Sequence, residues 1–157
     1  MTTRKRPAET PDLAGAYPRL THRQLSQLCR LGRRRPIGPG DVLVAEGQRD
    51  RDFMVVLSGK VAVVERYDTP RSRVIRVHGQ HRFLDELGLL TRQPSFVTMV
   101  AVEPGEILAV PVRALEEMVR QDPALGDLIL RALILRGGSH AGLARPALVD
   151  RCETRHV

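Results

Sequence analysis

One carboxylate, Glu86, stands in the best candidate for chemistry, the stretch FLDELGLLTRQPSF of residues 83–96. It lies at the mouth of a short apolar turn made by Leu87, Gly88 and Leu89, and a Pro-Ser step follows. The free backbone amides and positive end of a helical turn favour an anion, which is either the Glu86 carboxylate itself or a phosphorylated ligand. A phosphorylated ligand also needs a cation, so the neighbouring residues decide what this turn can bind.

Two histidines, His78 and His81, precede Glu86 and raise the alternative of a cupin-type metal enzyme. Such a site needs two histidines two residues apart, so that both project from one face of a strand. His78 and His81 are three residues apart, and we interpret both as loop histidines. The sequence also has no nucleophile elbow and no glycine-rich nucleotide loop. We therefore predict no catalytic residues, no metal and no cofactor.

The composition indicates a single domain without a dedicated nucleic-acid surface. The chain has 157 residues and a net charge of +7, and its basic residues are arginines spread along the sequence, except Lys5 and Lys60. Aromatic residues are only 3% of the chain, so they offer little base stacking. Cys29 and Cys152 lie far apart and predict neither a disulfide framework nor a zinc site. Because no apolar run resembles a signal or a membrane span, we expect a cytoplasmic protein.

The first half of the chain predicts a tail, a helix and short strands. Residues 1–19 mix charge with proline and small residues, and we expect a flexible basic tail. Thr21 and Gln24 have capping-box spacing, which predicts a helix that ends at Gly32. The following GRRRPIG is interpreted as a solvated edge strand. Glycine-cornered β-branched segments predict further strands near residues 42–45, 53–57, 61–64 and 74–77, as in a sandwich or barrel.

The second half predicts two more strands and two helices. Strands are expected near residues 96–102 and 107–110, divided by the turn EPGE, in which Gly105 suits the positive φ of a type II turn. A helix with Leu115, Met118 and Val119 on one stripe follows Pro111.

The last predicted helix extends from Pro123 to Arg136 and is apolar over most of its surface. It is either a well-buried helix or a helix that covers two surfaces, for instance the barrel and a second subunit. Residues 137–157 show no sustained periodicity, and we expect a disordered C-terminal tail.

The order of these elements resembles the cyclic-nucleotide-binding domain, the sensor module of catabolite activator proteins, cyclic-nucleotide-dependent kinases and gated channels. PGDVLVAEGQ resembles the early strand and glycine turn of the family, DFMVVLSGKVAVV its strand-Gly-strand signature, and RFLDELGLL its phosphate-binding cassette. The resemblance covers residues 20–136 and implies a mainly β fold. That fold is a jelly-roll-like β-roll with an N-terminal helix, a short cassette helix and two C-terminal helices.

The resemblance also implies how a ligand would bind. In the family, backbone amides of the cassette helix bind the cyclic phosphate, and a glutamate accepts a hydrogen bond from the ribose hydroxyl. An arginine about nine residues later donates two hydrogen bonds to the phosphate oxygens. Glu86 matches the glutamate, and Leu87, Gly88 and Leu89 match the amide turn. Glu86 as a simple partner of the turn amides remains the alternative.

The sequence departs from the family at the phosphate anchor. Counting from Pro94, the arginine position is Ser95, and the usually small residue after it is Phe96. Asp85 replaces a glycine and adds a negative charge. Arg92 could swing inward, but we interpret it as a solvated loop residue. Loss of a charge-assisted hydrogen bond of about 1.5–3 kcal/mol weakens binding by about one to two orders of magnitude, so we predict weak or no binding of cyclic AMP and cyclic GMP.

We predict a regulatory sensor or interaction module that is degenerate for cyclic nucleotides. The alternatives are a working sensor of a cyclic nucleotide or another anion through Glu86 and the cassette amides, and a ligand-free module that pairs as a homodimer through residues 123–136. A third is a detached regulatory domain with a redox effector partner, because residues 103–136 resemble the version fused to thioredoxin-reductase-like flavoproteins. About twenty residues follow Arg136, too few for a winged helix-turn-helix, so no DNA binding is expected.

Overall fold

The computed structural model describes residues 6–12, 14–84 and 92–136. In this part of the chain six strands form one antiparallel sheet in the order β1-β6-β3-β4, with β2 paired to β6 and β5 paired to β3. The strands are β1 (Arg33–Ile37), β2 (Val42–Val44), β3 (Phe53–Glu65), β4 (Arg73–His78), β5 (Phe83–Leu84) and β6 (Thr98–Val110). Helices α1 (His22–Cys29) and α3 (Val112–Gln121) flank the sheet, and residues 123–136 are also helical.

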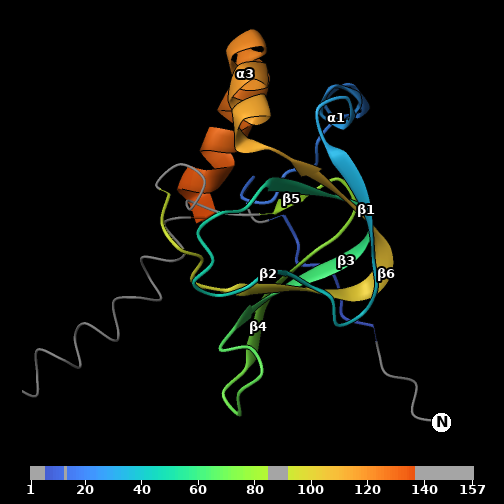
Figure 1. Ribbon diagram of the computed structural model, residues 1–157, viewed down its shortest axis with the longest axis vertical. Helices are drawn as coiled ribbons and strands as arrows, with labels where there is room; N and C mark the ends of the chain where they lie inside the picture. Colours follow the sequence, from blue (N-terminus) through green and yellow to red (C-terminus); the bar gives the residue numbers. More distant parts are fainter. Residues whose placement is uncertain (1–5, 13, 85–91, 137–157) are drawn as a thin grey trace, which may run out of the picture.

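The predicted β-roll is confirmed by this arrangement. The sheet curls so that α1 and α3 lie at one end of the roll, while the β3–β4 hairpin projects from the opposite end (Figure 1). The predicted cassette helix, together with Glu86, Leu87, Gly88 and Leu89, lies outside the described residues. No described helix is long and apolar enough to cross a membrane.

The predicted capping box at the start of α1 is confirmed. The Gln24 backbone N–H donates to the Thr21 hydroxyl at 3.2 Å, and the Thr21 N–H donates to the Gln24 side-chain oxygen at 2.9 Å. Leu25 and Leu28 are buried against the roll. The helix ends at Cys29, three residues before the predicted Gly32. Strand β1 is an edge strand with its arginines exposed, as predicted.

The prediction of a type II turn at EPGE is wrong. Both β3 and β6 continue for 13 residues, and they bend together where their register shifts near Ser58 and Glu106. Gly59 has a φ of 82°, whereas Gly105 does not have a positive φ. A Cβ added at Gly105 would lie 2.1 Å from the Ser58 carbonyl oxygen. The glycine is therefore needed because two backbones approach closely, and not because the chain turns back.

Two apolar clusters hold the roll and its helices together. The inside of the roll is filled from all sides of the curled sheet by residues that include Val44, Val63, Met99 and Ile107. A second cluster joins the end of the sheet to the helices, and its helical members are Leu25, Leu28, Leu115, Met118, Leu125, Ile129, Ala132 and Leu133. The apolar stripes predicted for the two C-terminal helices are therefore buried, whereas Leu130, Ile134 and Leu135 are exposed on the last helix.

Residues 6–12 and 14–19 differ from the flexible tail that we expected. The Thr10 hydroxyl accepts a hydrogen bond from the Val77 backbone N–H at 2.9 Å, and the Thr10 N–H donates to the Val77 carbonyl at 2.9 Å. Glu9 pairs with Arg82 at 3.1 Å, and Tyr17 is only 6% exposed. Composition did not reveal these contacts because they are made by a few residues to distant strands.

Candidate functional site

Ser95, at the arginine position of the family, is buried and satisfied by its own backbone neighbourhood. Its hydroxyl donates to the Val97 carbonyl at 2.8 Å. The Ser95 backbone N–H donates to the Gln48 carbonyl at 3.0 Å, and its carbonyl accepts from the Gly47 N–H at 2.7 Å. The turn at residues 47–48 therefore holds Ser95 in place, and the side chain at this position is neutral.

Phe96 and Arg92, the other described residues of the predicted site, both face solvent. Phe96 is 71% exposed, so it does not fill the inside of the roll. Arg92 is exposed with a φ of 54°, and it is not among the residues that line the pocket beside Phe96. The structure thus brings Ser95 and Phe96 to the rim of the roll and leaves Arg92 outside the pocket.

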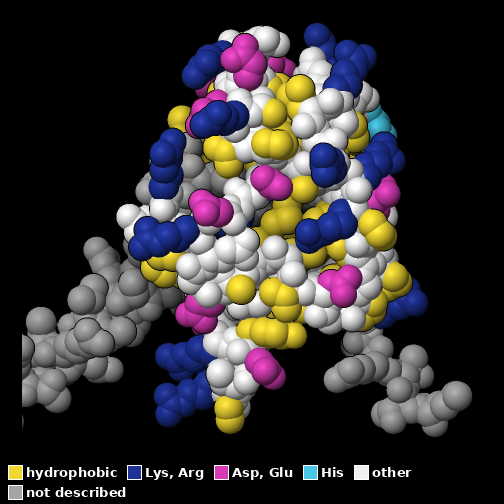
Figure 2. All heavy atoms as spheres, viewed as in Figure 1, with side chains coloured by type: hydrophobic (Ala, Val, Ile, Leu, Met, Phe, Trp, Pro, Cys, Tyr) yellow, Lys and Arg dark blue, Asp and Glu magenta, His cyan; other side chains and the backbone are white. Residues whose placement is uncertain are grey.

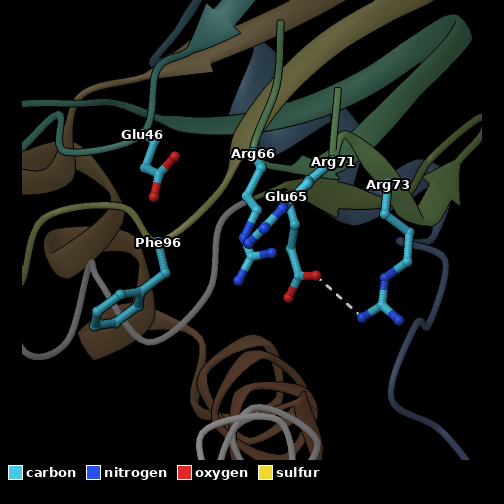
Figure 3. Close-up of a pocket in the computed structure, with 6 residues that line it drawn as sticks. All are labelled: Glu46, Glu65, Arg66, Arg71, Arg73 and Phe96. Atoms are coloured by element: carbon cyan, nitrogen blue, oxygen red, sulfur yellow. Dashed lines mark hydrogen bonds and ion pairs between the residues drawn. The ribbon is translucent and has the colours of Figure 1, made fainter. Parts of the chain in front are cut away.

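A pocket of about 440 Å³ opens beside Phe96. It is lined by Glu46, Glu65, Arg66, Arg71, Arg73 and Phe96 (Figure 3). Glu65 lies opposite Arg73 in the β3–β4 register, and their side chains pair at 3.0 Å. Because Glu65 follows Val63 by two residues, it lies on the strand face that lines the inside of the roll. The pocket is therefore the polar mouth of the apolar interior.

A second cluster of polar side chains lies inside the roll, where β4 meets the last helix. Arg76 and His78 are opposite Val63 and Val61 in the β3–β4 register, so they share the interior face of these strands. The ring of Tyr17 lies between them, with its centroid 5.3 Å from the Arg76 guanidinium carbon and 5.4 Å from the His78 ring centroid. Such contacts between a cation and an aromatic face are favourable.

Arg136 connects the last helix to this cluster of polar side chains. It is fully buried, its guanidinium lies 4.4 Å from the centroid of the Phe83 ring, and it donates to the carbonyls of Ala16 at 2.7 Å and Phe83 at 3.2 Å. Three segments distant in sequence, namely residues 6–19, strand β5 and the last helix, therefore meet at one side chain.

His78 and His81 lie in different environments. His78 ends β4 and is 2% exposed, so its interpretation as a loop histidine is wrong. Burial, together with the positive charges of Arg136, Arg76 and Arg82, lowers the pKa of His78 well below its ordinary value. His81 lies in the loop after β4 with a φ of 69°. The described residues contain no cluster of His, Cys, Asp and Glu that could hold a metal ion.

The sequence did not predict the arginines that line the pocket or the arginines of the buried polar cluster. Arg66 and Arg71 belong to a charged loop and carry no pattern that distinguishes them from solvated residues. Arg76 left a stronger signal, because a charged residue stands between the apolar residues Ile75 and Val77 in the β4 sequence RVIRVH. Arg136 likewise ends an apolar helix stripe, at a position that the structure buries completely.

A model of the cyclic nucleotide-binding domain matches residues 34–122. This match covers more than half of the chain, and together with the roll and its mouth it defines the class of protein. The chain belongs to the cyclic nucleotide-binding domain family.

Solved structures share the fold of this chain, and a curated protein is similar to it in sequence. The chain is 23% identical to the Thermus thermophilus catabolite activator protein with a TM-score of 0.68, over 87% of this chain and 63% of that chain. The regulatory domain of Toxoplasma gondii PKA, crystallised with cAMP, is 21% identical with a TM-score of 0.53, over 62% and 37% of the two chains. Lysophospholipase NTE1 of Cryptococcus neoformans is 26% identical over 76% of this chain, which spans only 7% of that protein.

Proposed function

We propose that this protein is a cytoplasmic regulatory sensor or interaction module, not an enzyme, that lacks the arginine-anchored binding of cyclic AMP and cyclic GMP. The observation that supports the proposal is Ser95, a buried neutral residue whose hydroxyl already donates to the Val97 carbonyl. The side chain at this position has no guanidinium group, which is the group that the family uses to bind the phosphate. A cyclic phosphate placed there would lose a charge-assisted contact of about 1.5–3 kcal/mol.

Calorimetric titration with cyclic AMP and cyclic GMP tests this proposal. We expect no binding at micromolar concentrations by the natural chain and tighter binding by a Ser95→Arg variant, which restores the family residue. Ser26→Arg, on the exposed surface of α1, adds the same charge elsewhere and should not change the titration. Micromolar or tighter binding of either cyclic nucleotide by the natural chain would refute the proposal.

The output of such a module is a shift between two packings of its C-terminal helices. The moving parts that we propose are α3 and the last helix, which contact the roll through Leu115, Met118 and Leu125. Arg136 supports this view, because it donates a hydrogen bond to the carbonyl of Phe83, which lies in β5 and within the cassette sequence RFLDELGLL. A ligand held by Glu86 and the cassette amides would act on the last helix through this connection.

A ligand-free assembly module is the second candidate, and the last helix favours it. Leu130, Ile134 and Leu135 are 47%, 62% and 39% exposed in the single chain. Pairing of two chains would bury them and stabilise a homodimer. Ile134→Asp should then turn a dimer into a monomer in light scattering, whereas Arg23→Asp, on the exposed surface of α1 and away from this face, should leave the mass unchanged. A monomeric natural chain would rule out this candidate. A redox effector protein remains the third proposed partner.

A further inference from the structure

The pocket at the mouth of the roll is lined by two arginines, Arg66 and Arg71, whose side chains form no ion pair with the described residues. Arg66 and Arg71 lie at the two ends of the β3–β4 turn, and Figure 3 shows their side chains between Phe96 and the Glu65–Arg73 pair. Arg73 is held by Glu65 at 3.0 Å. By contrast, neither the Arg66 nor the Arg71 guanidinium forms an ion pair within the part of the chain that the structure describes. Two unpaired guanidinium groups in one pocket favour an anionic ligand.

The backbone of the hairpin holds these arginines in place. The Thr69 hydroxyl donates to the Arg66 carbonyl at 2.6 Å and accepts from the Arg71 N–H at 3.3 Å. A second hollow of about 550 Å³ shares Glu46, Arg66 and Arg71 with the first pocket. Basic side chains gather on this projecting hairpin at the bottom of the view in Figure 2. The guanidinium groups are therefore accessible and attached to an ordered turn, which lowers the entropy cost of binding.

Phe96 adds an apolar face to the same pocket. The chain has three phenylalanines, and the other two, Phe53 and Phe83, are 1% and 0% exposed. An exposed phenylalanine loses the stabilisation that burial would give it, and at the rim of a pocket it offers a surface for stacking. Glu46 lines the pocket as well and can accept a hydrogen bond from a donor group of the ligand.

We propose that this pocket binds a small aromatic phosphate, with Arg66 and Arg71 on the phosphate oxygens and Phe96 against the ring. The volume of about 440 Å³ suits a ligand of this size, since ligand pockets measure about 300–1,000 Å³. This inference rests on the proposed function, because it gives the sensor a phosphate anchor on the β3–β4 hairpin in place of the arginine missing at Ser95. The ligand lies at the mouth of the roll and is held by residues outside the cassette.

Titration of the whole chain with phenyl phosphate and with inorganic phosphate, followed by NMR chemical shifts, tests the site. Phenyl phosphate should bind in the millimolar range or tighter, and inorganic phosphate about tenfold more weakly, because only phenyl phosphate can stack on Phe96. Arg66→Gln combined with Arg71→Gln should weaken both ligands at least about tenfold. Arg23→Gln combined with Arg131→Gln removes the same charge from exposed positions elsewhere and should retain binding.

Phe96→Leu isolates the stacking contact, because leucine is apolar but not planar. It should remove the preference for phenyl phosphate and leave inorganic phosphate unchanged. Absence of millimolar binding, or equal losses in the two arginine double variants, would overturn the inference. Tight cyclic AMP binding that is insensitive to Arg66→Gln with Arg71→Gln would instead contradict the proposed function, so the two failures are distinguishable.

Discussion

His78 makes the stability of the roll depend on pH. Its imidazole is buried beside Tyr17, and burial with the charges of Arg136, Arg76 and Arg82 holds the pKa of His78 well below the ordinary 6.5. Below about pH 6.5 the unfolded chain therefore binds a proton at this residue while the folded chain does not. The free energy of unfolding consequently falls as the pH falls, by up to about 1.4 kcal/mol per pH unit.

The variant His78→Leu removes this dependence. The Nδ1 atom of His78 has no hydrogen-bond partner among the described residues, so an apolar side chain of similar size removes no hydrogen bond of that atom. Urea denaturation followed by circular dichroism measures the free energy of unfolding at each pH. Between about pH 7.5 and about pH 5.5 the natural chain should lose about 1.4 kcal/mol more than the variant.

His81, whose pKa is lowered by burial and by His22 and Arg19, titrates in both chains and cancels in this comparison. Glu9 contributes at lower pH, because the pKa of its carboxyl is also lowered: burial opposes that shift, and its hydrogen bond to Arg19 and the charge of Arg82 outweigh burial. Parallel stability curves for the natural chain and His78→Leu would show that His78 takes up its proton in the folded state, and would refute the reasoning.

Three further changes test the packing by the same urea denaturation. Tyr17→Ala should cost about 3–5 kcal/mol, the range for a buried aromatic residue, whereas a residue of a flexible tail would cost nothing. Gly105→Ala should destabilise by about 1–3 kcal/mol, because its Cβ would meet the Ser58 carbonyl at 2.1 Å. Gly38→Ala, with its nearest atom 3.9 Å away, is the matched control, and equal effects of the two would contradict the argument. Thr21→Ala should cost about 1 kcal/mol through loss of the capping box, and an unchanged midpoint would speak against it.

The candidate site was only partly predictable from the sequence. The neutral residue at Ser95 could be found by counting from Pro94 along the chain. Arg66 and Arg71, which form no ion pair with the described residues, could not be found in this way, because a charged hairpin looks the same in sequence whether its side chains line a pocket or face solvent. The antiparallel pairing of β3 with β6, which places Val64 opposite Thr98, brings Phe96 beside them.

Local patterns determined much of the fold. The capping box of α1, the edge strand of arginines and the stripes of the two C-terminal helices follow from spacing of about 3.6 or 2 residues, which reports which face of an element is buried. The same patterns indicated the short strands of a sandwich or barrel, and the resemblance to the cyclic-nucleotide-binding domain implied the roll. These features depend on interactions between neighbours in sequence, and the sequence therefore contains them.

Contacts between distant residues were decided by the tertiary structure alone. Residues 6–19 looked like a tail, yet Tyr17 lies between Arg76 and Arg136, which are 59 and 119 residues further along the chain. Gly105 looked like a turn residue, yet its requirement comes from the Ser58 carbonyl on the neighbouring strand. In each case the stability depends on close contact between chain segments that are far apart in sequence. Such contact leaves no local periodicity in the sequence.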